Sequence, residues 1–329
     1  YGRKPIILLG LMLFVLGSIF CVGATTYSFL LIGRLLQGIG IAAPAILSFL
    51  IIADTYPLKR QQFFMAMLNG ALNISVAAAP VIGSYIALYF RWRGNFMLLL
   101  LLGLIVLLMT AIFVPTYKLP VHKEGISLRG YLTLFQSKPL LLLMINIILM
   151  FIPYWIFVGM SPLLYMKDLG VSLARFGYFQ GILALVFALG SILFGLIMHR
   201  FAQKSMLNLA SKIYIVSFLS LVFITFLDSH NPFLITCAFI PFIISQIIPS
   251  NLLLPVCLNF MPQAKARVSA VLQGSRLIIA SLSLQIAGYF YQGSFRNIGI
   301  IISLFILMVI VTQFFVVNNR ELMTFSQKL

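Results

Sequence analysis

Apolar runs that are long enough to cross a bilayer follow one another along almost the whole chain. A transmembrane helix needs about 20 predominantly apolar residues. Ten runs meet this length: 5–24, 29–53, 64–88, 95–114, 139–160, 176–198, 205–227, 232–257, 268–291 and 297–317. The connections between them are short except for 115–138, which contains two prolines and several charges. The pattern predicts an all-α polytopic membrane protein with ten transmembrane helices.

The amino-acid composition supports a membrane protein and limits the kinds of partner that we expect. The chain is 62% hydrophobic and 8% charged, with a mean hydropathy of +1.12, whereas soluble domains carry about a quarter charged residues. The net charge of +17 is explained better by the excess of Lys and Arg in cytoplasmic loops than by a nucleic-acid partner. We therefore expect the lipid bilayer as partner and no nucleic acid. Cys21, Cys237 and Cys257 lie far apart in apolar runs and are interpreted as buried hydrophobes.

The distribution of Lys and Arg predicts the orientation, and the long loop predicts the domains. With the N-terminus in the cytoplasm, cytoplasmic segments carry an about threefold excess of Lys and Arg, so we expect both termini there. The predicted units are a four-span bundle (1–114), a cytoplasmic central loop (115–138), a six-span bundle (139–318) and a cytoplasmic tail (319–329). Transporters are often built from matched halves. Four plus six spans would then represent helices 3–12 of a six-plus-six protein that lacks its first two helices. A ten-helix carrier with five-plus-five symmetry is an alternative, and the loop after the fourth span argues against it.

Three short segments stand out: two combine charge with glycine or proline, and the third combines small residues with proline. They are Tyr1-Gly2-Arg3-Lys4-Pro5, Arg34-Leu35-Leu36-Gln37-Gly38-Ile39-Gly40 and Ala78-Ala79-Pro80-Val81-Ile82-Gly83. A guanidinium inside a span is costly unless it faces protein or water, and it can lower the pKa of a facing carboxyl group. Glycines permit close helix approach and proline bends a helix. Alternatively, Arg34 snorkels to the headgroups, and Pro80 and Gly83 reflect the ordinary frequency of these residues in transmembrane helices.

These segments resemble signatures of the major facilitator superfamily. The first resembles the second half of its cytoplasmic loop signature, the second its fourth-helix motif, and the third the fifth-helix signature of drug:proton antiporters, with Ala79 where glycine is usual. Finer features resemble the bicyclomycin- and chloramphenicol-resistance (Bcr/CflA) branch. They are Asp54-Thr55-Tyr56-Pro57, Trp92-Arg93-Gly94-Asn95-Phe96, Ser161-Pro162-Leu163-Leu164-Tyr165, Phe176-Gly177-Tyr178-Phe179 and Val268-Ser269-Ala270.

The resemblance implies a multidrug efflux transporter of the bacterial inner membrane. It would exchange protons for a small hydrophobic drug by alternating access, as a monomer and as part of a longer parent protein. The alternative is an inactive truncated remnant that inserts in the membrane but cannot couple protons. We expect no enzyme, no cofactor and no metal, because the sequence has no Cys/His metal spacing and no Walker-type phosphate loop.

The candidate residues fall into two groups. For the substrate and proton pathway we expect Arg34, Gln37, Asn73, Asn146, Tyr154, Gln246 and Arg276. For gating and helix packing we expect Gly2, Arg3, Lys4, Gly38, Gly40, Asp54, Pro80 and Gly83. The amides either bind a drug by hydrogen bonds in an apolar cavity or form hydrogen bonds between helices. Arg276 either faces a cavity or extends its side chain to the headgroups. All five acidic residues (Asp54, Glu124, Asp168, Asp228 and Glu321) lie in predicted loops or at helix ends, so the chain as given is expected to lack a proton carrier.

Overall fold

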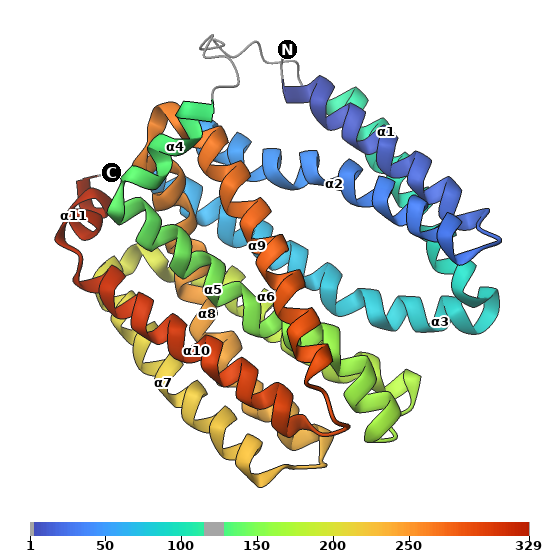
Figure 1. Cartoon of the computed structure of the whole chain (residues 1–329). Helices are drawn as coiled ribbons and strands as arrows, with labels where there is room; N and C mark the ends of the chain where they lie inside the picture. The colour runs from blue at the N-terminus through green and yellow to red at the C-terminus, as the bar shows by residue number, and fades with distance from the viewer. Residues whose placement is uncertain (1–2, 115–127, 329) are drawn as a thin grey trace. The chain divides into compact units, whose positions relative to one another are not determined.

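The computed structural model describes residues 3–114 and 128–328, and in this part of the chain all regular structure is helical. The long helices are α1 (Arg3–Val22), α2 (Tyr27–Thr55), α3 (Leu58–Phe113), α5 (Lys138–Ser161), α6 (Leu173–Ile197), α7 (Gln203–Leu227), α8 (Pro232–Phe260), α9 (Lys265–Tyr289) and α10 (Phe295–Asn318) (Figure 1). A π-helical segment, η1 (Pro162–Asp168), follows α5, and short 3-10 helices, η2 (Met198–Arg200) and η3 (Pro262–Ala264), follow α6 and α8. Within these described residues, ten segments are long and apolar enough to span a membrane, which confirms the predicted fold class.

The helix α3 contains two of these ten segments. The helical hydrogen bonding runs from Leu58 to Phe113, but Arg91 has φ 55° and ψ −164°, outside the helical region. A positive φ is uncommon for a residue with a Cβ and marks a sharp break in the backbone. The sequence placed a six-residue connection between spans at this point, whereas the structure needs a single non-helical residue.

The chain divides into two compact units, and the first consists of Tyr1–Ile51 and Ile82–Ser127. In this unit α1 and α2 approach closely through glycines. A Cβ added at Gly10 would lie 2.5 Å from the Gly40 backbone oxygen, and one added at Gly33 would lie 2.7 Å from Cys21 Sγ. Small residues replace the hydrophobic effect as the basis of tight helix packing in lipid, because they let backbones come into contact.

The second unit consists of Ile52–Val81 and Leu128–Leu329. In it, α7 packs against α8 and α10, while α5 packs against α8, α9 and α10, and α6 packs against α8 (Figure 1). Residues 52–81, which the sequence assigned to the four-span bundle, lie in this unit. A Cβ at Gly70 would lie 2.5 Å from Ile192 Cγ1, so this glycine permits a close approach of α3 to α6.

Two short helices lie in segments predicted as loop and tail. They are α4 (Leu128–Gln136) and α11 (Arg320–Lys328). Leu134 of α4 and Leu322 of α11 are fully buried. A search for 20-residue apolar runs misses such helices, because one or two buried side chains suffice to hold nine residues against a bundle.

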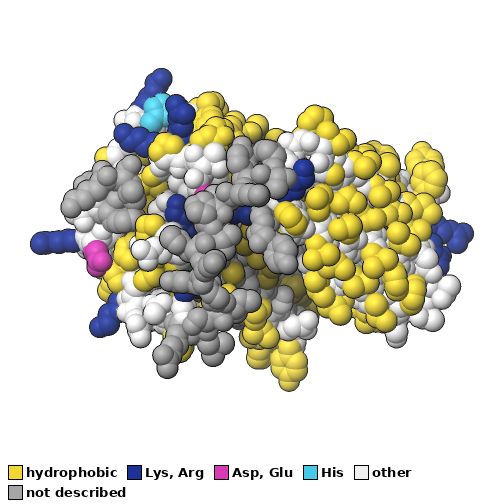
Figure 2. Space-filling model, turned by 90° about the horizontal axis from the view of Figure 1, so that it is seen from above, with side chains coloured by type: hydrophobic (Ala, Val, Ile, Leu, Met, Phe, Trp, Pro, Cys, Tyr) yellow, Lys and Arg dark blue, Asp and Glu magenta, His cyan; other side chains and the backbone are white. Residues whose placement is uncertain are grey.

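Much of the exposed surface of the molecule is apolar. Figure 2 shows broad areas of hydrophobic side chains, with Lys and Arg gathered in small groups. Leu35, Ile112, Leu193, Phe226 and Ile278 are all more than half exposed. In water such patches would drive aggregation, whereas lipid chains solvate them at no cost.

Candidate functional site

Arg34 begins a chain of polar contacts inside the first unit. Its Nη1 donates to Gln37 Oε1 at 3.0 Å, and Gln37 Nε2 donates to Ser18 Oγ of α1 at 2.7 Å. Ser18 in turn donates to the Phe14 carbonyl oxygen at 2.8 Å. Gln37 and Ser18 are buried, while Arg34 is exposed and lies 6.0 Å from the centre of the Phe96 ring. Gln37 therefore connects the exposed guanidinium of Arg34 to the buried hydroxyl group of Ser18 through two hydrogen bonds.

The candidate packing residues of the first unit differ in their surroundings. A Cβ on Gly40 would lie 2.6 Å from the Gly10 oxygen, whereas one on Gly38 would meet open space. A Cβ on Gly83 would be in ordinary contact with Asn95, 3.4 Å from its Oδ1. Close helix approach in this motif therefore depends on Gly40.

The basic residues at the start of α1 were expected to belong to a gating loop. Lys4 Nζ donates to the Ala111 carbonyl oxygen at 2.8 Å and joins the start of α1 to the end of α3. Arg3 is partly exposed in the first turn of α1. Gly2 lies outside the described residues.

Two candidate amides of the second unit join helices. Asn146 Nδ2 of α5 donates to Thr312 Oγ1 of α10 at 3.0 Å, and Gln246 Nε2 of α8 donates to the Met150 carbonyl oxygen of α5 at 2.8 Å. Both side chains are buried. Their contacts are those of interhelical hydrogen bonds, although the Asn146 Oδ1 is buried without a partner in the described chain.

A row of amides that the sequence reading left out of its site prediction lies between α3 and its neighbours in the second unit. Asn69 Nδ2 donates to Asn251 Oδ1 at 2.7 Å, and Asn251 Nδ2 donates to Ser191 Oγ of α6 at 2.8 Å. Near the start of α3, Asn259 Nδ2 of α8 donates to Gln61 Oε1 at 2.5 Å. The recurrence of amides at membrane depth was the available signal, but their pairing needs the fold. Of the predicted residues, only Asn73 touches this row, through its bond to the Asn69 oxygen at 2.9 Å.

Asp54 and Pro80 are the remaining candidates near the segment 52–81. Lys265 Nζ lies 3.7 Å from Asp54 Oδ1 and donates to the Ala53 carbonyl oxygen at 2.8 Å. The contact therefore joins the last turn of α2 to the first residue of α9. Pro80 is inside α3, and its backbone lies within 3.6 Å of the position of a Cβ built on Gly177 of α6.

Arg276 lies in the middle of the span Pro262–Tyr289, next to α5. Its Nη1 donates to Gln273 Oε1 at 2.8 Å, and its guanidinium carbon lies 3.9 Å from the centre of the Phe151 ring. Its Nε is buried without an acceptor among the described residues. Tyr154, one turn beyond Phe151 on α5, is 9% exposed and its hydroxyl group is likewise buried without a partner there.

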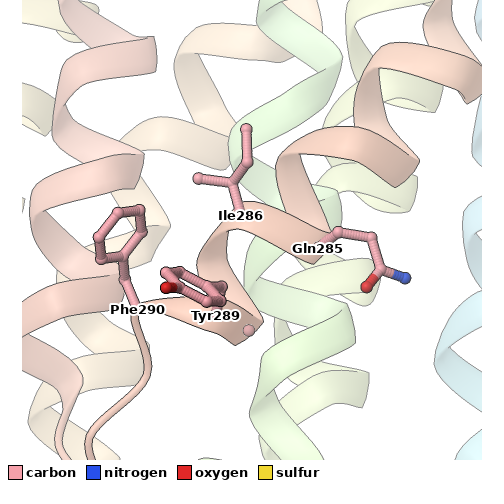
Figure 3. Close-up of a pocket in the computed structure, with 5 residues that line it drawn as sticks. Gln285, Ile286, Tyr289 and Phe290 are labelled. Atoms are coloured by element: carbon pink, nitrogen blue, oxygen red, sulfur yellow. The ribbon is translucent and has the colours of Figure 1, made fainter.

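A hollow of about 490 Å³ lies at the C-terminal end of the same helix, α9. It is lined by Gln285, Ile286, Gly288, Tyr289 and Phe290. In Figure 3 the Gln285 side chain points to one side, and the Tyr289 and Phe290 rings lie on the other. None of the predicted site residues lines it.

The side chains that could hold a metal do not gather in the described part of the chain. No group of three or more His, Cys, Asp or Glu side chains occurs there.

Comparison with known proteins identifies the class. The sequence profile of the Major Facilitator Superfamily matches residues 1–284, so the chain belongs to this superfamily of membrane transporters. The multidrug resistance protein MdtL of Shewanella oneidensis is 30% identical over 228 residues, which cover 68% of this chain and 56% of that protein. MdtL of Klebsiella pneumoniae is 29% identical over 194 residues, which cover 56% of this chain and 47% of that protein. The chain thus spans about half the length of these curated relatives.

Solved structures agree on the fold. The human organic anion transporter MFSD10 superposes with a TM-score of 0.69 at 18% identity, covering 95% of this chain and 77% of that one. A bacterial homologue of the iron transporter ferroportin, in an outward-facing state, gives a TM-score of 0.72 at 14% identity, covering 97% of this chain and 84% of that one. At these identities the likeness is one of fold.

Proposed function

We propose that the native protein exports small hydrophobic molecules from the cytoplasm in exchange for protons, by alternating access. The similarity to MdtL supports drug efflux, and the sequence resemblance to the Bcr/CflA branch points the same way. The exchange would be carried out by two helical bundles, residues 1–114 and 139–318, together with two further N-terminal helices of a longer parent. The protein would act without a chemical reaction on its substrate, and as a monomer.

The observation that carries the proposal is the Arg34–Gln37–Ser18 chain. Arg34 Nη1 reaches Gln37 at 3.0 Å and Gln37 reaches Ser18 at 2.7 Å, within otherwise apolar helices. An ionisable residue at membrane depth is expensive to keep and marks a functional pathway by default. A fixed positive charge favours the ionised form of a facing carboxyl group, which would promote proton release. The carboxyl group itself would lie on a helix that precedes residue 1.

The proposed location is the bacterial inner membrane, with both termini in the cytoplasm. Lys4, Lys138 and Arg320, at the starts of α1, α5 and α11, would face the cytoplasm, together with the loop 115–138. The positive-inside bias supports this orientation. Single cysteines placed at Lys138 and Arg296 would test it, because only the second should react with an impermeant maleimide added to intact cells.

The experiment that tests the function uses everted inner-membrane vesicles from cells that express the full native gene. Respiration establishes an inward proton gradient, which a pH-sensitive dye reports. Addition of a neutral antibiotic such as chloramphenicol should dissipate part of the gradient through antiport. The variant Arg34→Ala should abolish this response at equal protein level. The matched control is Arg175→Ala, which removes an exposed cation at the start of α6 and should respond normally.

Two results would overturn the proposal in different ways. A normal drug response from Arg34→Ala would remove the role of the Arg34–Gln37–Ser18 chain. A wild-type protein that inserts normally but gives no response to any hydrophobic drug would favour the second candidate, a non-transporting remnant. That candidate rests on the position of the acidic residues, since Asp54, Asp168, Asp228 and Glu321 all lie at helix ends in the described chain.

A further inference from the structure

Arg276 is too deep in the membrane to reach water at either surface along its own helix. It lies in the centre of the span Pro262–Tyr289, with 13 or more residues on each side. At 1.5 Å per residue, the guanidinium group is about 20 Å from either end of the span, which is well beyond the reach of an arginine side chain. Snorkelling, which the sequence left open, does not fit this position.

The positive charge of Arg276 is not neutralised within the described chain. A guanidinium has five N–H donors. One nitrogen, Nη1, donates to Gln273 at 2.8 Å, and Nε is buried with no acceptor. No carboxylate of the described residues lies within ion-pair distance of it. The side chain as a whole is partly exposed, so an incoming ligand can reach the guanidinium. A charge at membrane depth that lacks a counter-ion is unfavourable, and an anionic ligand would lower this free-energy cost.

The surroundings of Arg276 are aromatic and come from α5. The guanidinium group stacks on Phe151 at 3.9 Å, and the Phe151 ring lies 5.2 Å from Trp155. The helices α5 and α9 are parallel and in register here, since Gly159 and Leu284 are in contact eight residues beyond Phe151 and Arg276 on both helices. Tyr154, whose hydroxyl group also lacks a partner, follows Phe151 by one turn.

The positions of the acidic residues determine which charge a ligand at the depth of Arg276 would meet. Asp54, Asp168, Asp228 and Glu321 all lie at the ends of their helices in the described chain. A cationic molecule at the depth of Arg276 would therefore meet positive charge and no described carboxylate. An anionic group would instead gain charge-assisted hydrogen bonds from the guanidinium, which are about twice as strong as neutral ones.

We propose that Arg276, Gln273, Phe151 and Tyr154 form a binding site for the carboxylate of an amphipathic aromatic acid. The carboxylate accepts from the Arg276 guanidinium and the Tyr154 hydroxyl, and the aromatic body of the ligand packs beside Phe151 and Trp155. The inference deepens the proposed efflux function, on which it rests, by assigning organic acids as a substrate class.

The chain contains its own reporter for this site. It has two tryptophans, Trp92 and Trp155, and only Trp155 lies in the aromatic group beside Arg276. The variant Trp92→Phe therefore leaves one fluorescent indole near the proposed carboxylate. Quenching of Trp155 is measured in lipid nanodiscs at pH 7 with three probes of similar size: 4-butylbenzoate, 4-butylbenzamide and 4-butylbenzylammonium.

The benzoate should bind at least about tenfold more tightly than the amide, and the ammonium more weakly than either. Arg276→Gln should remove the preference for benzoate over amide while leaving amide binding unchanged. Tyr154→Phe should reduce the preference by a few fold. The matched control is Lys212→Gln, which removes the same charge from an exposed position in α7 and should keep the full preference.

Equal binding of benzoate and amide by the Trp92→Phe protein would overturn the inference without any further variant. A preference that persists in folded Arg276→Gln protein, or that Lys212→Gln also abolishes, would overturn it as well. The efflux function fails separately: vesicles that give no drug-dependent proton flux, from a protein that retains the benzoate preference, would refute transport and leave the binding site in place.

Discussion

The amide of Asn251 offers a quantitative test of what holds α3, α6 and α8 together in the second unit. Asn251 is fully buried, and it accepts from Asn69 Nδ2 at 2.7 Å and donates to Ser191 Oγ at 2.8 Å. It also donates to the Ile247 carbonyl oxygen of its own helix at 2.9 Å. Replacing Asn251 by Ala removes both interhelical hydrogen bonds at once and leaves the Asn69 amide without its acceptor.

The expected loss in the free energy of unfolding follows from the number of interhelical hydrogen bonds that the substitution removes. Hydrogen bonds between transmembrane helices contribute about 0.6 kcal/mol on average and up to about 1.7 kcal/mol each. Two such bonds give a loss of about 1–3 kcal/mol in the free energy of unfolding. The bond to Ile247 adds little, because the helix satisfies that carbonyl oxygen on its own. The matched control is Ser250→Ala, since Ser250 Oγ donates only to the same Ile247 oxygen at 3.0 Å among the described contacts.

The assay is reversible unfolding in mixed micelles with increasing dodecyl sulfate, followed by circular dichroism. Asn251→Ala should shift the midpoint to lower detergent fraction by the equivalent of about 1–3 kcal/mol, and Ser250→Ala by less than about 0.5 kcal/mol. If both variants unfold together with the wild type, the amide row does not stabilise the unit. If Asn251→Ala is more stable than the wild type, the row is a stability cost that the chain retains for another reason.

Two further predictions concern helix packing and a titrating group outside the spans. Gly40→Ala should lower the yield of folded, monodisperse protein in detergent, because a Cβ on Gly40 would lie 2.6 Å from the Gly10 oxygen. Gly38→Ala should leave the yield unchanged, because a Cβ on Gly38 would meet open space. Equal yields of the two variants would contradict this prediction. Burial raises the pKa of Tyr291 above its ordinary value of about 10, and the Asp168 carboxylate, which accepts a short hydrogen bond from its hydroxyl group, raises it further. The stability from this contact is therefore fully present below about pH 10 and is lost as the pH rises through the higher folded-state pKa. The difference in tyrosinate absorbance between wild type and Tyr291→Phe should show this group ionising well above pH 10 in the folded protein, and ionisation near 10 would refute the assignment.

Hydrophobic run length was sufficient to predict the number and approximate place of the spans, because the bilayer imposes a minimum length on every crossing. Run length could not locate the chain reversal at Arg91, where a single residue with φ 55° separates two spans. Nor could it find α4 and α11, whose burial depends on single side chains such as Leu134 and Leu322. These features arise from tertiary packing, which leaves no long apolar run.

The candidate polar residues were identifiable by type, whereas their roles depend on partners distant in sequence. Asn146 and Gln246 were singled out because an amide at membrane depth is unusual, yet only the fold shows that they bond Thr312 and the Met150 carbonyl oxygen. Asn251 carries more interhelical bonds than either and was left out of the predicted site. A sequence gives no means to rank amides when all of them lie in apolar runs, because the number of bonds depends on which helices meet.

Lys212, Arg34 and Arg276 are three cations that lie within membrane spans. They differ in depth and in hydrogen-bond partners, and these two properties determine how each charge is stabilised. Lys212 is exposed nine residues after the start of α7, about 13 Å along the helix, within reach of the headgroups for a long flexible side chain. Arg34 is exposed but tied to buried Gln37 and, through it, to Ser18, so its charge is already solvated by a chain of dipoles. Arg276 lies mid-span, beyond reach of the headgroups, and although its Nη1 donates to Gln273 and it stacks on Phe151, its Nε is buried without an acceptor in the described chain. Of the three, Arg276 therefore has the most to gain from an anionic ligand, whereas Arg34 already has its charge paired with protein dipoles.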